Sequence, residues 1–165
     1  MSAFIDSFIA AAKGEVGVEE VNGSNCGPRV DEYKAATWLS PTKGWPWCAA
    51  FVCWCVREAA TDSGTPFTSK FKRPRTAGAW DFENWSLDQD SSTWTKKPHR
   101  NDIEAGDIVI FKFSHIGIAL SAPSQAGLVQ TVEGNTDAAG SREGGGVFLK
   151  KRHASKIRSR IRFRV

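Results

Sequence analysis

One cysteine in this chain stands where nucleophilic chemistry is possible. Cys48 lies in the segment WPWCAAFVCWCV, residues 45–56, where Pro46 and a run without Gly or charge predict a helix that begins near Pro46. The first turn of a helix offers unpaired backbone N–H groups and the positive end of the helix dipole. Both favour a thiolate, the form that attacks a carbonyl carbon. Cys48 is therefore a candidate nucleophile, although most helical cysteines are simply small buried residues.

A cysteine nucleophile needs a base within hydrogen-bond reach, and one histidine suits that role. His99 and His153 lie among charged residues, where we expect solvated side chains. His115 instead opens a predicted strand and shares its face with Gly117 and Ala119, whose small size leaves room beside the ring for a helix end or a substrate. We expect His115 to be the base; a histidine packed in the core is the alternative.

A third group must fix the tautomer of the base. Glu133 and Asn135 stand two residues apart on the predicted strand LVQTVEGN, on one face and just ahead of a turn. A carboxylate there could accept the imidazole N–H and stabilise the imidazolium once the thiol has given up its proton. The pair alone is a weak motif. The order Cys, His, Glu, with the nucleophile on a helix start and its partners on later strands, is a stronger signal.

A helix and a sheet must bring these side chains together, and the chain contains signals for both. Helices are expected from Ser2 to about Lys13, over residues 29–38 and over residues 46–60. Residues 61–101 form a long aromatic-rich connection that could contain a short helix over 76–85. From Asp102 onwards, apolar or alternating segments predict strands. Helices followed by strands predict an α+β fold in which an antiparallel sheet packs on the central helix.

Length and composition indicate one globular domain over residues 1–165. The chain is 41% hydrophobic, with seven Trp and ten Phe, which is enough to bury an ordinary core. Eight of its 22 basic residues and none of its 18 acidic residues lie in residues 150–165. Apolar residues alternate with arginines there, which predicts a half-buried strand with a solvated arginine face. The alternative is attraction to an anionic polymer such as a cell wall, a lipid surface or nucleic acid.

The four cysteines indicate neither a disulfide framework nor a metal site. Cys48, Cys53 and Cys55 share one predicted helix on which none can reach another, so only Cys26 could pair with one of them. The C-x-C spacing on a helix does not converge on zinc, and we expect no metal and no cofactor. The first residues lack the pattern of a secretory signal, and no segment is long enough to cross a bilayer.

Three segments, WPWCAAFVCWCV, GDIVIFKFSHIGIAL and TVEGNTD, resemble in order and spacing the CHAP domains, the cysteine, histidine-dependent amidohydrolases and peptidases of the papain-like superfamily. The upstream segment GSNCGPRVDEY is similar to that of phage and bacterial wall hydrolases, so the resemblance covers about residues 15–164. It implies a papain-like fold with Cys48 as nucleophile, His115 as general base, Glu133 as orienting acid and Asn135 as a fourth polar member. Some members bind calcium through aspartates just ahead of the nucleophile. None stands in residues 33–47, so that site is not carried over.

The resemblance implies hydrolysis of an amide bond in bacterial peptidoglycan, either between muramic acid and the first alanine or within the peptide, as in phage endolysins. Thiolate attack would give a tetrahedral intermediate and then an acyl-enzyme that water cleaves. The backbone N–H of Cys48 is expected to donate to the oxyanion, with Asn25 as a second donor. Trp45 and Trp47 could line the substrate groove; packing of both indoles around the central helix is the alternative.

Two other interpretations stay open. An NlpC-type cysteine endopeptidase shares the nucleophile-on-helix plan, but that family usually shows an acidic residue just before its cysteine, where this chain has Trp47, and a second histidine where it has Glu133. A non-catalytic wall-binding or phage structural module is the second. We expect a bacteriolytic monomer whose partner is peptidoglycan, without nucleic acid and without stable membrane insertion. It would be made in the cytoplasm and act on the wall after release, as a phage lysin or an injected toxin.

Overall fold

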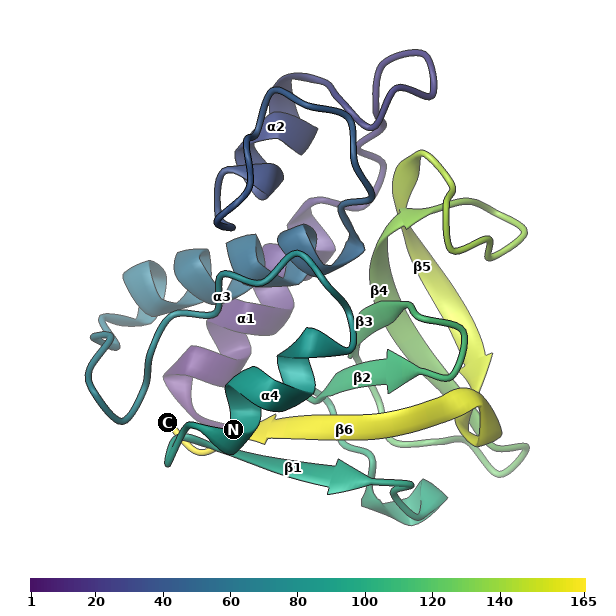
Figure 1. The fold of residues 1–165 in the computed structure, drawn as a ribbon. Coiled ribbons are helices and arrows are strands. Elements are labelled where there is room, and N and C mark those ends of the chain that lie inside the picture. Colours follow the sequence, from purple (N-terminus) through teal and green to yellow (C-terminus); the bar gives the residue numbers. More distant parts are fainter.

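The helices share one hydrophobic core with one face of an antiparallel sheet (Figure 1). The computed structural model describes residues 1–165. Its helices are α1 (Ala3–Gly14), α2 (Pro28–Lys34), α3 (Cys48–Ser63) and α4 (Asp81–Leu87), with two short 3-10 turns, η1 (Arg100–Asp102) and η2 (Ala154–Lys156). Its strands are β1 (Ser92–Lys96), β2 (Ile108–Phe111), β3 (Ile116–Ala119), β4 (Leu128–Thr136), β5 (Gly146–His153) and β6 (Ile157–Phe163), in the spatial order β1-β6-β2-β3-β4-β5. The predicted α+β class, with helices first and an antiparallel sheet after, is confirmed.

The central helix α3 is buried on most sides, as its apolar sequence predicts. The main core contains 29 buried residues, and α3 contributes to it along most of its length. Gly64 ends the helix in a left-handed conformation, with a φ of 67°. A second cluster of six buried residues, which includes Val109 and Phe111, lies on the opposite face of the sheet. The sheet is therefore covered on one side by helices and filled on the other by its own side chains.

The main differences from the prediction concern α2, α4 and β1. α2 ends at Lys34 rather than near residue 38, because the Thr37 hydroxyl donates to the Lys34 carbonyl and the Trp38 N–H donates to the Arg75 carbonyl. The short helix expected over residues 76–85 is α4 and begins only at Asp81. Residues 92–96, expected to be irregular, form the edge strand β1, which pairs with β6. For α2 and β1, the deciding contact comes from a distant part of the chain.

The arginines of β6 form ion pairs, which the predicted solvated arginine face does not include, although the side chains of Arg158 and Arg162 remain 33% and 25% exposed. Arg158 lies 2.8 Å from Glu83 of α4, and Arg160 lies 2.8 Å from Asp102 of η1. Arg162 lies 2.8 Å from the buried carboxylate of Asp107, ahead of β2. The alternation itself is correct, because Ile157, Ile161 and Phe163 are buried on the other face. These carboxylates compensate much of the positive charge that the sequence concentrates near its end.

The structure also bears on the expectations for disulfides, metal sites and membrane-spanning segments. All four cysteines are free thiols. No group of three or more His, Cys, Asp or Glu side chains is arranged to hold a metal ion. None of the helices combines the length and the apolar character that crossing a bilayer requires.

Candidate active site

Cys48 is the first residue of α3, and only 7% of it is exposed. Trp47 precedes it as the N-cap residue but makes no side-chain capping bond. The first N–H groups of α3 therefore have no capping side chain, and their positive dipoles lie at the thiol. This is the environment that the sequence predicts for a cysteine nucleophile.

A glycine on β4 lets the start of α3 approach the sheet. A β-carbon at Gly134 would lie 2.8 Å from the Cβ of Phe51 and 2.9 Å from the ring of Trp47, closer than real side chains pack. Only glycine fits there without moving the helix. Gly134 directly follows Glu133 in β4, so the close contact of Gly134 with Phe51 and Trp47 also sets the position of Cys48 relative to Glu133.

His115 is placed by a tight turn between β2 and β3. Ser114 adopts a left-handed φ of 57° in this turn, and the Phe111 N–H donates to the His115 carbonyl at 2.8 Å. The imidazole is fully buried, and its Nε2 lies 2.9 Å from Oε1 of Glu133. Nδ1 has no hydrogen-bond partner. When Nε2–H donates to the carboxylate, the lone pair of Nδ1 is left available to the thiol of Cys48.

The carboxylate of Glu133 is fully buried and bonded on several sides. It accepts from the Thr131 hydroxyl at 2.5 Å and from Nε of Arg152 at 2.9 Å, in addition to His115. A β-carbon at Gly117 would lie 2.7 Å from Cγ of Glu133. The space beside Gly117, expected to receive a helix end or a substrate, is therefore occupied by the Glu133 side chain.

Arg152 on β5 is a member of this group that the sequence analysis does not single out. Its guanidinium binds both oxygens of Glu133, with Nη2 at 2.5 Å from Oε1, and its side chain is only 11% exposed. Nη1 donates to the Gly140 carbonyl at 3.1 Å, and Cζ lies 5.3 Å from the centre of the Phe111 ring. The register of β5 against β4 places Phe148 opposite Glu133 and Arg152 opposite Val129, so neither the alternation along GVFLKKRH nor the strand pairing singles out Arg152, whose long side chain reaches along β4 to the carboxylate.

The charges in this group shift two pKa values. Burial raises the pKa of Glu133, but the hydrogen bonds from Arg152 and His115 outweigh it and lower that pKa to about 2. Burial lowers the pKa of His115, but its side-chain interactions with Cys48 and Glu133 outweigh it and raise that pKa to about 9. The structure thus joins His115, Glu133 and Arg152 in one series of contacts, with Cys48 beside the imidazole, and this arrangement favours the positively charged form of His115.

Asn135 lies next to this group but makes other contacts. β4 has a register shift between Glu133 and Thr136, and Asn135 adopts a left-handed φ of 57°, so the simple alternation that placed Asn135 on the face of Glu133 does not hold. Its side chain is buried, and Nδ2 donates to the Arg142 carbonyl at 3.1 Å. Its Oδ1 has no hydrogen-bond partner.

The three residues expected to contact substrate differ in exposure. Trp47 is fully buried, and its Nε1 donates to Glu20 at 2.9 Å, so its ring packs in the core and does not face a groove. Trp45 is half-buried and keeps part of its ring at the surface. Asn25 is half-buried in the loop before α2, with a left-handed φ of 57°. For Trp47, packing around the central helix is therefore the correct alternative.

Two comparisons with known proteins give matches. A family model described as CHAP domain matches residues 40–135. Among solved structures, the crystal structure of a wild-type endolysin, LysIME-EF1, superposes with a TM-score of 0.59 at 16% sequence identity, over 96% of this chain and 63% of that chain. This likeness shows the fold, and the chain spans about 63% of the length of the endolysin chain. No curated protein matches the sequence.

Proposed function

The chain belongs to the CHAP domain family, and from this premise we propose that it hydrolyses an amide bond of bacterial peptidoglycan with Cys48 as nucleophile. The bond is either the amide between N-acetylmuramic acid and L-alanine or a peptide bond within the stem or cross-bridge. The observation that carries the proposal is the buried pair of His115 and Glu133, 2.9 Å apart, beside a thiol at the start of α3. A wall substrate is also supported by the name of the structural neighbour, which is an endolysin.

In the first half of the reaction, the Cys48 thiolate attacks the carbonyl carbon, a C–S bond forms and the carbonyl oxygen becomes an oxyanion. The backbone N–H of Cys48 is the proposed oxyanion donor, since a helix start presents it without reorganisation, and Asn25 is the proposed second donor. The imidazolium of His115 then gives its Nδ1 proton to the leaving nitrogen. The C–N bond breaks, the amine departs and a thioester remains on Cys48.

In the second half, neutral His115 takes a proton from water, and the resulting hydroxide attacks the thioester carbon. The C–S bond breaks, which releases the acid and restores the thiolate beside the imidazolium. Glu133 stays ionised throughout, because its pKa of about 2 lies far below the working pH. Its role is to hold Nε2–H and to stabilise the positive ring.

The direct test is digestion of purified cell wall. The parent chain should release soluble fragments and new amino groups, and mass spectrometry of the fragments identifies the bond. Cys48→Ser should lower release by at least about 10³-fold, because a hydroxyl in this position is a much weaker nucleophile. Cys26→Ser is the matched control, since Cys26 is also a free thiol but lies outside the group, and it should digest wall at the parent rate.

Two outcomes would contradict the proposal. Digestion by Cys48→Ser at the parent rate would remove Cys48 from the mechanism. Wall binding by the parent chain without release of fragments would indicate a non-catalytic binding module instead of a hydrolase.

A further inference from the structure

A hollow of about 320 Å³ lies between the loop after α2, the chain at residues 72–76 and α4. Among the residues that line it are two tryptophans, three cations and one carboxylate: Trp38, Trp85, Lys72, Arg73, Arg75 and Asp88. We call it the tryptophan–arginine hollow. None of the residues that line it belongs to the group of Cys48, His115, Glu133 and Arg152, so the hollow is separate from the candidate active site.

The cations of this hollow have no acidic partner. Lys72, Arg73 and Arg75 take part in none of the ion pairs of the structure, whereas Arg158, Arg160 and Arg162 of β6 are all paired. The pKa of Arg73 is lowered by burial first and then by repulsion from Arg75 and Arg57. The Nε of Arg75 is buried without a hydrogen-bond partner. Positive charge that is crowded and partly buried costs stability unless an anion compensates it.

The two indoles are held in place by the same stretch of chain. The guanidinium of Arg75 lies 3.5 Å from the centre of the Trp38 ring, and the backbone N–H of Trp38 donates to the backbone carbonyl of Arg75 at 3.1 Å. The Trp85 Nε1 donates to the Lys72 carbonyl at 3.1 Å. Even so, Trp38 is 73% exposed, which is unusual for so large an apolar side chain. The hollow is thus a preformed surface of flat aromatic and planar cationic groups.

We propose that the tryptophan–arginine hollow binds phosphodiester groups of an anionic wall glycopolymer and holds the protein at the wall while the Cys48 site acts. Guanidinium groups bind phosphate oxygens through paired N–H donors, and three cations against one carboxylate leave the hollow electropositive. An exposed indole can pack against the C–H faces of a sugar or polyol. The identity of the partner rests on the proposed function; the anion chemistry of the hollow does not.

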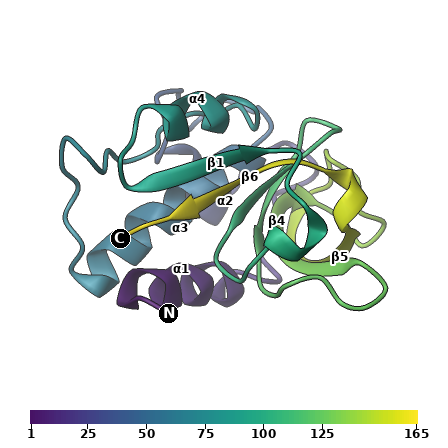
Figure 2. The ribbon, with the colours of Figure 1, turned by 90° about the horizontal axis from the view of Figure 1, so that it is seen from below.

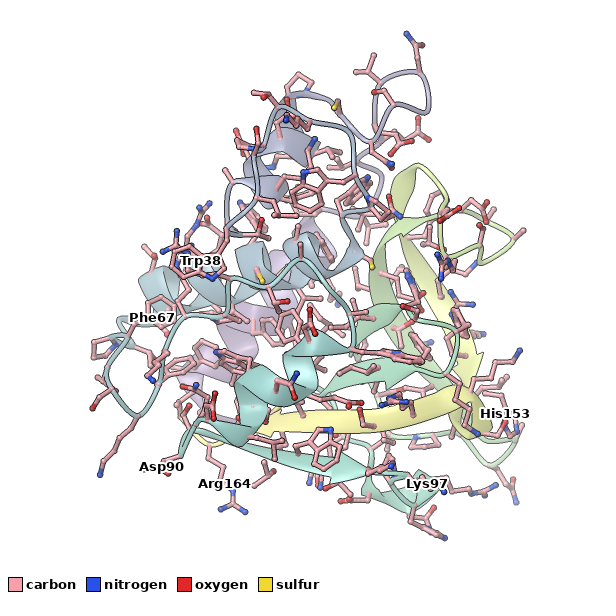
Figure 3. The ribbon with its side chains drawn as sticks, in the orientation of Figure 1. Trp38, Phe67, Asp90, Lys97, His153 and Arg164 are labelled. Atoms are coloured by element: carbon pink, nitrogen blue, oxygen red, sulfur yellow. The ribbon has the colours of Figure 1, made fainter.

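The test measures sedimentation of the Cys48→Ser chain with purified wall, so that binding is observed without digestion. The pair Lys72→Gln and Arg73→Gln should weaken binding about tenfold, the loss expected for one or two charge-assisted contacts. The matched control is the pair Lys96→Gln and Lys97→Gln, which removes the same charge. Lys97 projects at the other end of the molecule from Trp38 (Figure 3), and neither lysine is ion-paired, so binding should change less than about twofold.

Wall stripped of phosphodiester polymers with hydrofluoric acid identifies the ligand. The parent Cys48→Ser chain should lose most of its binding to stripped wall, and a soluble glycerol phosphate oligomer should compete with intact wall. Undiminished binding to stripped wall would assign the anion to peptidoglycan carboxylates and overturn the proposal. Two further results would attribute the binding to general charge and overturn the proposal. One is a DNA oligonucleotide with the same number of phosphates that competes as well as the glycerol phosphate oligomer does. The other is an equal loss of wall binding in the Lys72→Gln/Arg73→Gln and Lys96→Gln/Lys97→Gln variants.

The melting temperature distinguishes wall binding by Arg73 from a structural role of Arg73, and hydrolysis distinguishes the inference from the proposed function. Arg73→Gln relieves repulsion, so its melting temperature should equal or exceed that of the parent; a lower one would assign Arg73 to the fold and contradict the inference. With Cys48 intact, Arg73→Gln should cleave soluble peptidoglycan fragments at the parent rate. A parent chain that binds phosphate-bearing wall without cleaving it would refute the proposed function alone, and cleavage without any dependence on wall phosphate would refute the inference alone.

Discussion

At the scale of single residues, the chemistry depends on one carboxylate held between two cations. Glu133 contacts the imidazole of His115 on one side and the guanidinium of Arg152 on the other. The carboxylate stabilises a positive His115, whereas Arg152 stabilises the carboxylate and opposes part of its effect on the ring. Removing the charge of Glu133 or of Arg152 should therefore shift the titration of His115, and the two shifts should have opposite signs.

Glu133→Gln should move the alkaline limit of activity to lower pH. In the parent, the imidazolium needed to protonate the leaving nitrogen is lost as the pH rises through about 9, the pKa of His115. The negative charge of Glu133 contributes to that raised pKa, and a neutral amide does not, so the limit should fall by roughly one unit or more. The measurement is kcat/KM against pH on soluble fragments. An alkaline limit that stays at its parent value would show that Glu133 does not act on His115.

Arg152→Met should shift the profile in the opposite direction. Without the guanidinium, the pKa of Glu133 rises from about 2, so the acid limit of activity moves up. The Glu133 charge is then less compensated and holds the imidazolium more strongly, so the alkaline limit moves up too. Arg152→Lys should return both pH limits part of the way to their parent values, because lysine keeps the positive charge but cannot make the bidentate contact with Glu133. If Arg152 acted only as packing, Arg152→Met would lower activity at every pH with both limits unchanged.

The same pair gives a stability prediction with a definite sign. A carboxylate whose pKa falls from 4.5 to about 2 on folding contributes stability that is present above pH 4.5 and lost as the pH falls through about 2. In Arg152→Met the pKa of Glu133 in the folded protein should lie closer to 4.5. The stability that its carboxylate contributes is then lost at a higher pH, so acid unfolding should begin at a higher pH than in the parent. At neutral pH, breaking the buried pair should cost about 3–5 kcal/mol. Thermal unfolding followed by circular dichroism from pH 2 to 8 measures both effects, and identical acid-unfolding curves would contradict the prediction.

The sequence is informative for residues that stand at the ends of elements and uninformative for those that depend on pairing. Cys48 follows a proline–tryptophan signal, His115 directly precedes the strongly patterned β3, and Glu133 lies on the strongly patterned β4, so their types and order are enough to group them. Arg152 is one of eight basic residues in residues 150–165, and even the strand register places it opposite Val129, so only the path of its side chain along β4 brings it to Glu133. Asn135 is displaced by an irregularity in the same strand, which no alternation pattern reveals.

At the scale of elements, the approach of α3 to β4 places the nucleophile, and a glycine makes that approach possible. Gly134→Ala would put a β-carbon 2.8 Å from Cβ of Phe51, so α3 must shift. We expect a loss of about 1–3 kcal/mol in the free energy of unfolding and a larger relative loss of activity, because the shift moves Cys48 away from His115. Gly14→Ala is the matched control: its added methyl group would have no atom within 4 Å, and the change should be neutral or slightly stabilising. Full activity in a stable Gly134→Ala chain would show that α3 does not depend on this contact.

The elements that the sequence fails to locate are those whose own patterns are weak. β1 is polar and gains its structure from β6, which also pairs with β2. α2 is cut short where the Trp38 N–H binds the Arg75 carbonyl, far along the chain. α3 and the strands after residue 107 have strong apolar patterns and are therefore found from local sequence alone. Long-range hydrogen bonds account for the differences.

At the scale of the whole molecule, α1 near the start of the sequence packs against β6 near its end. Figures 1 and 2 show the N- and C-termini close together, and the rings of Phe4 in α1 and Phe163 in β6 are 5.0 Å apart. The family match over residues 40–135 leaves out α1, α2, β5 and β6. Two of these are essential to the geometry, since β6 joins β1 to β2 and β5 supplies Arg152. We therefore propose that residues 1–165 fold as one unit that is larger than the matched segment.

Phe8→Ala tests this unity from a position that is remote in sequence from the proposed active-site residues. Phe8 is fully buried in α1, and its ring packs 5.3 Å from that of Phe163, so the substitution should cost about 3–5 kcal/mol and lower the melting temperature by roughly 10 °C. If the domain is cooperative, the loss of helical circular dichroism and the exposure of the Cys48 thiol to a thiol reagent should shift together by the same amount. Leu87→Ala, at a residue that is 64% exposed, is the control and should change neither transition appreciably. The contrary result would be a Cys48 thiol that becomes reactive at the same temperature as in the parent, while only the helical circular dichroism signal is lost at a lower temperature. It would mean that α1 unfolds separately and that the elements around the active site stay folded without it.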